Sequence, residues 1–386
     1  MMKNFLLILL VLSCGCGRQE TGDIGVIDLL SRPSGEITDL SEIASDIEYI
    51  PFQTSEESLI RYINDFKTSN NKFYINTLMD IICFDKTGRY LYKLSKAGRG
   101  PGEYTFIYDY DISSDDDFLM ILSTRILSIF KETENGFVFS KTLNINFQPS
   151  RIGFVPGQNN ILLSYSSAYG IEPYRNVIIN MNGDTLDVRP NYNKYIKIGK
   201  SNIGFKDENM SFKYNNSLYF KQFFSDTVFT VERSGNIGPY LILDSHGKRP
   251  TTEARANSDY LEEHMSEMIL LHNIMEVSRY FIYSFTFESS THYFIYDKFS
   301  NKKLEINSKT FLKDDISGGV NFEPKFCSDG KFYSWVDALA LKKYISGNSF
   351  KNSVVKNPEK KKALEKLADS LNITDNPVLI VVTPKK

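Results

Sequence analysis

The stretch "KAGRGPGEY", Lys96 to Tyr104, combines three glycines with an arginine and a glutamate, a mixture that can bind phosphate. A phosphate-binding loop follows a strand, opens a helix and presents free backbone N–H groups. Here Pro101 removes one donor, and the following "EYTFIYDYDI" is typical of a strand. We therefore interpret the stretch as a corner between strands, in which Arg99, Glu103 and Tyr104 are candidate ligand contacts.

Acidic side chains at five scattered positions could supply oxygen ligands to a divalent cation, which prefers about six to eight of them. They are Asp80, Asp109, Asp111, Asp226 and Glu288. No acidic position repeats along the chain, so we predict no metal site and no cofactor. A metal-dependent hydrolase or lyase at the mouth of a central channel remains the alternative function.

Two histidines, His264 and His272, are expected on one inserted helix. They are eight residues apart, whereas zinc ligands on one helical face are about four apart. This spacing does not favour a zinc site.

Aromatic rings and an arginine occur together in the segment "SYSSAYGIEPYR". Its candidate ligand contacts are Tyr165, Tyr169, Tyr174 and Arg175, to which we add Arg125 and Phe223 from other connections. Such rings offer a large contact area and few rotatable bonds to immobilise, which suits a binding surface. The alternative is that these residues pack against the body of the protein.

The composition is that of an ordinary globular protein, with 41% hydrophobic and 24% charged residues among 386. A formal charge of -2 gives no reason to expect nucleic acid as a partner. The 28 phenylalanines and 23 tyrosines against one tryptophan favour β-structure.

The first 16 residues are predicted to be a bacterial lipoprotein signal peptide with its lipidation site. Lys3 precedes an apolar run, residues 5–12, that is too short to span a bilayer. The following "VLSC" resembles a lipobox, so Cys14 is the expected lipidation site and Cys16 the alternative; a plain secretory signal is also possible. Residues 17–35 are then expected to tether an exported protein to the cell envelope.

The two remaining cysteines, Cys83 and Cys327, lie in the apolar contexts "IICF" and "PKFC". We expect both to be small buried hydrophobes and not nucleophiles or half of a disulfide framework.

Short strand-like runs repeat along the chain with a glycine turn in common. Gly88, Gly136, Gly183 and Gly235 follow such runs at intervals of 48, 47 and 52 residues, and Asn301 takes the equivalent place later. This period is typical of propeller blades. We predict an all-β fold, a six-bladed β-propeller of four-stranded antiparallel blades formed by residues 36–386; the alternative is an irregular β-sandwich.

The long connections are predicted to lie on one face of this propeller. In an up-and-down blade, the connection between the second and third strands and the connection to the next blade emerge on the same side. The helical insertions, at about 245–274 and 350–376, both fall in such connections. Residues 47–54 are expected to supply the last strand and close the ring, which removes exposed sheet edges.

The segments "EITDLSEIASDIEYIPFQT", "IICFDKTGRYLYKLSKAGRGPGEY" and "NPVLIVV" resemble those of bacterial six-bladed β-propeller lipoproteins, which are similar to NHL-type propellers. The resemblance implies an exported propeller and says little about activity. We expect a monomeric, lipid-anchored protein of the envelope whose loop-rich face binds a glycan, a peptide or another envelope protein.

Overall fold

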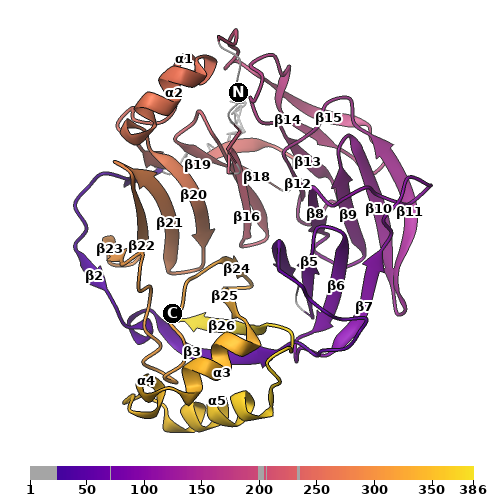
Figure 1. Ribbon diagram of the computed structural model, residues 1–386. Coiled ribbons are helices and arrows are strands. Elements are labelled where there is room, and N and C mark those ends of the chain that lie inside the picture. Colours follow the sequence, from indigo (N-terminus) through magenta and orange to yellow (C-terminus); the bar gives the residue numbers. More distant parts are fainter. Residues whose placement is uncertain (1–23, 70, 199–203, 206, 233–234) are drawn as a thin grey trace, which may run out of the picture.

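The computed structural model describes residues 24–386 except 70, 199–203, 206 and 233–234. Six small sheets surround a central axis as the blades of a propeller, which confirms the predicted fold class (Figure 1). Within each blade, strands that follow one another in sequence pair antiparallel, and the first strand lies innermost.

The strands of the first three blades follow chain order. Blade 1 contains β4 (Asp65–Thr68), β5 (Lys72–Asn76), β6 (Asp80–Asp85) and β7 (Tyr90–Ser95); blade 2 contains β8 (Asp109–Ile112), β9 (Phe118–Ser123), β10 (Ile126–Thr133) and β11 (Gly136–Asn144); blade 3 contains β12 (Arg151–Phe154), β13 (Ile161–Ser164), β14 (Tyr174–Ile179) and β15 (Thr185–Pro190).

The last three blades also include strands from the N-terminus. Blade 4 contains β16 (Asn209–Tyr214), β17 (Ser217–Gln222), β18 (Thr227–Val231) and β19 (Ile237–Asp244), with β1 (Gly25–Asp28) at its edge; blade 5 contains β20 (Leu270–Glu276), β21 (Tyr280–Phe287), β22 (Ser290–Asp297) and β23 (Lys302–Ile306), with β2 (Gly35–Ile37) at its edge; blade 6 contains β24 (Phe326–Ser328), β25 (Lys331–Val336), β26 (Val378–Pro384) and β3 (Ala44–Pro51).

The core lies between the blades. The middle strands are buried on both faces because a neighbouring blade packs on each side, so their sequences are continuous apolar runs such as "IICF" of β6 and "LMILS" of β9. Each pair of neighbouring blades shares an apolar cluster. The outermost strands β11 and β15 are largely exposed, whereas β7 is mostly half-buried.

The ring is closed by the N-terminal segment, as predicted. β3 pairs antiparallel with β26, from Ala44 beside Pro384 to Pro51 beside Val378. Residues 25–28 and 35, which were expected to belong to the tether, are instead part of the fold as β1 and the start of β2. Both strands pair parallel with the outer strand of a blade, and their few residues show no alternating pattern.

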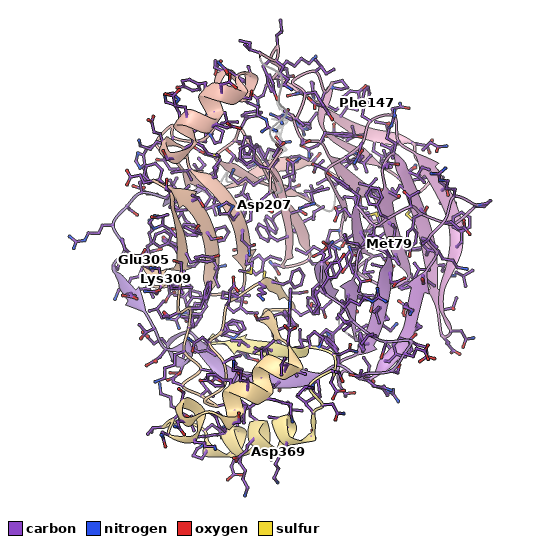
Figure 2. The ribbon with its side chains drawn as sticks, in the orientation of Figure 1. Met79, Phe147, Asp207, Glu305, Lys309 and Asp369 are labelled. Carbon is purple, nitrogen blue, oxygen red and sulfur yellow. The ribbon has the colours of Figure 1, made fainter. Side chains whose placement is uncertain are left out.

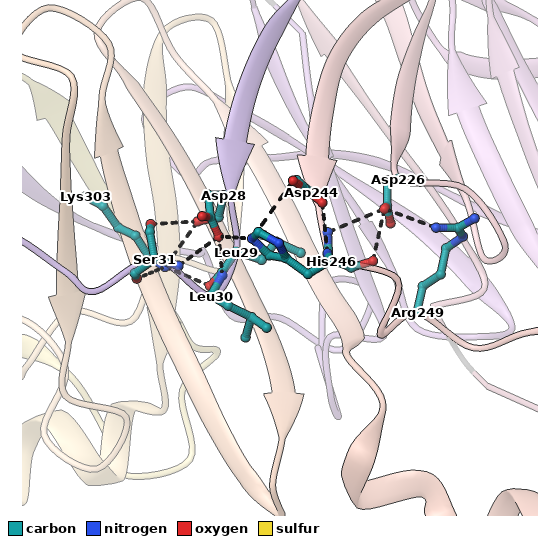
Figure 3. Close-up of polar contacts among 10 residues, drawn as sticks. Asp28, Leu29, Leu30, Ser31, Asp226, Asp244, His246, Arg249 and Lys303 are labelled. Atoms are coloured by element: carbon teal, nitrogen blue, oxygen red, sulfur yellow. Dashed lines mark hydrogen bonds and ion pairs between the residues drawn. The ribbon is translucent and has the colours of Figure 1, made fainter.

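β1 and the residues after it are held to blades 4 and 5 by polar contacts (Figure 3). The imidazole of His246 lies 2.9 Å from Asp28, and Lys303 donates to the carbonyls of Leu29 and Ser31 at 2.7 and 2.8 Å. Because β1 runs parallel to β19, it ends on the side from which the connection between blades 4 and 5 emerges.

We use two names for the faces of the ring. The loop-rich face carries the connections between second and third strands and those between blades. The turn face carries the tight turns between first and second strands and, in blades 1 to 5, those between third and fourth strands. The insertion between blades 4 and 5 holds α1 (Thr252–Ala256) and α2 (Ser258–His264), and that in blade 6 holds α3 (Ala338–Ser346), α4 (Asn348–Lys351) and α5 (Pro358–Ser370). Both insertions therefore lie on the loop-rich face, as expected.

Two helical boundaries differ from the prediction. The helix that was expected to carry both histidines ends at His264, and His272 lies on β20. The insertion in blade 6 begins earlier than expected, with α3. No helix of the described residues has the length and apolar character needed to cross a bilayer.

Candidate functional site

The glycine-rich stretch forms a hydrogen-bonded corner between blades 1 and 2. The backbone N–H of Gly100 donates to Glu103 Oε2 at 2.7 Å, and that of Gly98 donates to the carbonyl of Tyr104 at 3.0 Å. Gly102 has φ +75 and packs against Phe139. The carboxylate of Glu103 thus holds its own loop together, as a corner requires.

The three candidate contacts in this corner differ in exposure. Tyr104 is 2% exposed and its hydroxyl donates to the carbonyl of Leu94, so its side chain belongs to the core. Arg99 and Glu103 are exposed. Arg125 is also exposed, on the separate turn between β9 and β10.

Two acidic residues near the axis, Asp109 and Asp111, hold blade 2 to blade 3 by hydrogen bonds. Asp109 and Asp111 each accept a 2.7 Å hydrogen bond from a backbone N–H of blade 3, and Asp111 also pairs with Lys213 at 2.7 Å. Burial raises the pKa of Asp109 to about 6, although Arg151 and Lys67 act in the opposite direction.

The other carboxylates do not join Asp109 and Asp111. Asp226 pairs with Arg249 at 3.2 Å, while Asp80 begins β6 and Glu288 lies in the turn after β21. Across the residues that the structure describes, no group of three or more His, Cys, Asp or Glu side chains could hold a metal ion.

Arginine and phenylalanine side chains meet on the loop-rich face between blades 3 and 4, and we call them the Arg–Phe cluster. It consists of Arg175, Phe205, Phe223, Phe224 and Arg255. The rings of Phe205 and Phe223 stack at 5.0 Å, and the guanidinium of Arg255 lies 5.1 Å from the first and 5.6 Å from the second. Arg175 lies 5.1 Å from the ring of Phe224.

Four different segments place these side chains. Arg175 sits at a register shift of β14 against β15, and such bulges redirect a side chain out of the regular alternation. Phe223 and Phe224 form the turn after β17, Phe205 lies in the connection 191–208, and Arg255 is on α1. The backbone N–H of Ile198 donates to the carbonyl of Ala256 at 2.6 Å and so fastens that connection to α1.

The two arginines are buried but have different partners. Arg255, 5% exposed, pairs through Nη2 with Glu208, which is itself 4% exposed. Arg175, also 5% exposed, leaves Nε and Nη2 without a hydrogen-bond partner among the described residues. Burial lowers the pKa of Arg175 to about 10, with Glu172 and Glu208 opposing the shift, so it is still a cation at neutral pH.

Two further buried atoms near the Arg–Phe cluster have no hydrogen-bond partner in the described chain. They are Nη1 of Arg255 and Oε2 of Glu172. Buried polar atoms are nearly always paired, so four unpaired ones in neighbouring residues mark this region as unusual.

The connection 165–173 lies beside the cluster and is fastened mainly by hydrogen bonds. The hydroxyl of Tyr195 donates to the carbonyls of Ser167 and Ala168 at 2.5 and 3.1 Å. Asn191 Nδ2 donates to the carbonyl of Glu172 at 2.9 Å. At the tip, Tyr169 and Ile171 are 59% and 76% exposed.

The predicted aromatic residues therefore divide into two groups. Tyr165 is buried and its ring lies 6.4 Å from that of the half-buried Tyr174, so both pack against the body of blade 3. Tyr169 projects to solvent, whereas Phe223 is half-buried in the Arg–Phe cluster. Phe205, Glu208 and Arg255 were not identified from the sequence as members of this site. For Arg255, the available signal was an arginine between two alanines in the helical segment "TEARA".

Comparison with known families decides which group of proteins the chain belongs to. A model described as a domain of unknown function, DUF4934, matches residues 24–383. The chain belongs to the DUF4934 family. No curated protein matches the sequence.

Two solved structures share the fold of this DUF4934 protein. A "putative exported protein" of Bacteroides fragilis NCTC 9343 superposes with a TM-score of 0.70 at 20% identity, covering 91% of this chain and 99% of its own. A member of the DUF4221 family from Bacteroides vulgatus ATCC 8482 gives a TM-score of 0.50 at 12% identity, covering 89% and 97%. At these identities the likeness concerns the fold alone.

Proposed function

We propose that this protein is an exported, lipid-anchored propeller that binds a ligand through its loop-rich face. The observation that carries the proposal is the distribution of exposed apolar side chains. The large apolar side chains that are exposed in loops of this face include Leu78, Met79, Phe106, Tyr108, Phe147, Tyr169, Ile171, Tyr192, Ile196 and Ile198. Met79 and Phe147 are labelled in Figure 2.

The turn face is different. Among its described turns, Phe299 is the one large apolar side chain that is exposed. Contiguous exposed apolar surface marks interaction sites more often than scattered single residues do. The loops of blades 1 to 4 on the loop-rich face are thus the surface that best fits a glycan, a peptide or an envelope protein.

A metal-dependent hydrolase or lyase has no comparable support. Asp109 and Asp111 hold blades together, Asp226 pairs with Arg249, and Asp80 and Glu288 do not join them, so we propose no catalytic function.

Binding to glycan and peptide arrays tests the proposal with two matched triple variants. One carries Tyr169→Ser, Tyr192→Ser and Ile196→Ser on the loop-rich face; the other carries Val138→Ser, Leu186→Ser and Val188→Ser on exposed outer strands. We expect the first to lose binding at least tenfold and the second to bind like the unmodified protein. Equal behaviour of both variants would rule out the loop-rich face.

The lipid anchor needs a separate test. Metabolic labelling with an alkyne fatty acid should mark the unmodified protein and the Cys16→Ala variant, and should fail to mark Cys14→Ala. Labelling that survives Cys14→Ala but not Cys16→Ala would move the modification to the second cysteine.

A further inference from the structure

The edge of the Arg175 guanidinium is arranged to receive an anion. The central carbon of the guanidinium lies over the ring of Phe224, 5.1 Å from the ring centre, and the hydrogen-bond donors of the group lie at its edges. The two unpaired nitrogens, Nε and Nη2, share one edge of the planar group and point in the same direction. This pair of parallel donors matches the two oxygens of a carboxylate.

The neighbouring atoms add one donor and one acceptor. Nη1 of Arg255 has no hydrogen-bond partner among the described residues, while Nη2 of the same group is engaged by Glu208. Oε2 of Glu172 is an acceptor without a partner among the described residues, while Oε1 accepts the backbone N–H of Tyr169 at 2.8 Å. A matching ligand therefore carries an anionic group for the arginines and a hydrogen-bond donor, such as a hydroxyl, for the glutamate.

We propose that Arg175, Arg255 and Glu172 form a binding site for a hydroxylated carboxylic acid, of which a uronic-acid sugar is the best fit. The proposal rests on the proposed function and names the ligand class for the same face. The ring of Tyr169, 59% exposed beside Glu172, supplies a surface on which a sugar ring can stack. A peptide C-terminus has the carboxylate and an amide N–H beside it, but lacks the sugar ring that would stack on Tyr169.

A ligand can reach the unpaired nitrogens of Arg175 only if part of the protein moves, because these nitrogens are buried. We infer that the movable cover is the connection 165–173, which leads into Arg175: its tip residues Tyr169 and Ile171 are exposed, and Tyr195 and Asn191 hold it by hydrogen bonds. Segments with few buried apolar contacts open at the lowest free energy.

Calorimetric titration of the propeller body with trigalacturonate tests the site, and galactotriose serves as the neutral counterpart. We expect trigalacturonate to bind at least tenfold more tightly than galactotriose. Arg175→Gln should abolish that difference. Arg189→Gln, on the exposed strand β15 of the same blade, is the control and should bind like the unmodified protein.

A separate variant tests whether the connection 165–173 moves when the ligand binds. Tyr195→Phe removes the hydroxyl that holds Ser167 and Ala168, so the association rate for trigalacturonate should rise several-fold. Thermal melting checks that each variant is folded. If Arg175→Gln does not fold, the comparison of the two sugars with unmodified protein still decides the question.

Three results would overturn the proposal. Trigalacturonate and galactotriose could bind equally, Arg175→Gln could keep the preference for the acid, or acidic peptides could compete as well as the uronide. In each case the proposed function would still stand if the unmodified protein bound a ligand on the arrays and the loop-rich-face triple variant did not. If the unmodified protein bound no ligand on the arrays either, both proposals would fail.

Discussion

Cys83 and Cys327 are free thiols that lie in the core, 0% and 5% exposed. Burial raises the pKa of Cys327 to about 12 and that of Cys83 well above its usual value. A thiol reacts as the thiolate, so both side chains should be inert in the folded protein.

Thiol labelling checks this. At pH 8, the body that begins after the two N-terminal cysteines should show no reaction with a disulfide reagent within an hour, and two thiols should react after unfolding in guanidinium. Rapid labelling of either cysteine in the folded state would contradict the burial.

Asp314 holds the connection between blades 5 and 6 in place. The carboxylate is 1% exposed and accepts hydrogen bonds from the backbone N–H groups of Ile316, Ser317 and Gly319 at 2.8 to 3.0 Å, and from the hydroxyl of Tyr49 at 3.1 Å. Tyr49 belongs to β3, so this residue also joins the closing strand to the ring.

Replacing Asp314 with alanine should lower the free energy of unfolding by about 3 kcal/mol or more, because several buried donors lose their acceptor. Urea denaturation measures the change. Asp115→Ala, at an exposed turn between β8 and β9, is the control and should cost less than about 1 kcal/mol. Similar losses in both variants would argue against the special role of Asp314.

At the scale of single elements, β1 is attached in part through a titratable contact. His246 hydrogen-bonds Asp28 on β1 and lies 3.9 Å from Asp244 on β19. The hydrogen bond to Asp28 raises the pKa of His246. The contact therefore adds stability fully below the pKa of an unfolded histidine, about 6.5, and loses it as the pH rises through the higher folded value.

Hydrogen exchange followed by mass spectrometry should show this loss. After correction for the intrinsic rate, amides of β1 should be more protected at pH 6 than at pH 8.5. His246→Asn should remove that difference, while the amides of β5 should be unaffected in both proteins. A pH dependence that persists in the variant would assign it to another group.

The repeated turns show why sequence alone was enough to predict the blades. Gly88, Gly136, Gly183 and Gly235 have φ between +84 and +112, and Asn301 has φ +54. Each takes the left-handed conformation that glycine and asparagine tolerate best, in the turn between the third and fourth strands of a blade. A local backbone requirement that recurs in blades 1 to 5 leaves a periodic trace in the sequence.

The Arg–Phe cluster left no such trace. Arg175, Phe223 and Phe224 were visible as polar and aromatic loop residues, but Phe205 and Arg255 join them only because the connection 191–208 docks on α1. Likewise, β1 and β2 pair with strands more than 200 residues later in the sequence. Contacts between residues far apart in the sequence do not recur from blade to blade, so a local sequence pattern cannot predict them.

At the scale of the molecule, the ring depends on its N-terminal strands to different degrees. β3 fills the outer position of blade 6, whereas β1 and β2 only extend blades 4 and 5. Without β3, the whole edge of β26 would be open to pairing with another chain, which is a known cause of aggregation.

Two truncations separate these roles. A chain that begins at residue 38 should fold as a monomer with a melting temperature lower by several degrees. A chain that begins at residue 55 should aggregate or elute as an oligomer on gel filtration. Monomeric, cooperatively melting behaviour of the shorter chain would show that blade 6 is stable with three strands.

The direction of β1 has a consequence for how the protein stands on a membrane. The strand runs toward the loop-rich face, so its first residue, Gly25, lies toward the turn side of blade 4. The roughly ten residues between Cys14 and Ile24 span at most about 35 Å when fully extended. A lipid on Cys14 would thus keep the turn face next to the bilayer and hold Arg175 and its surroundings outward, where large polymers can reach them.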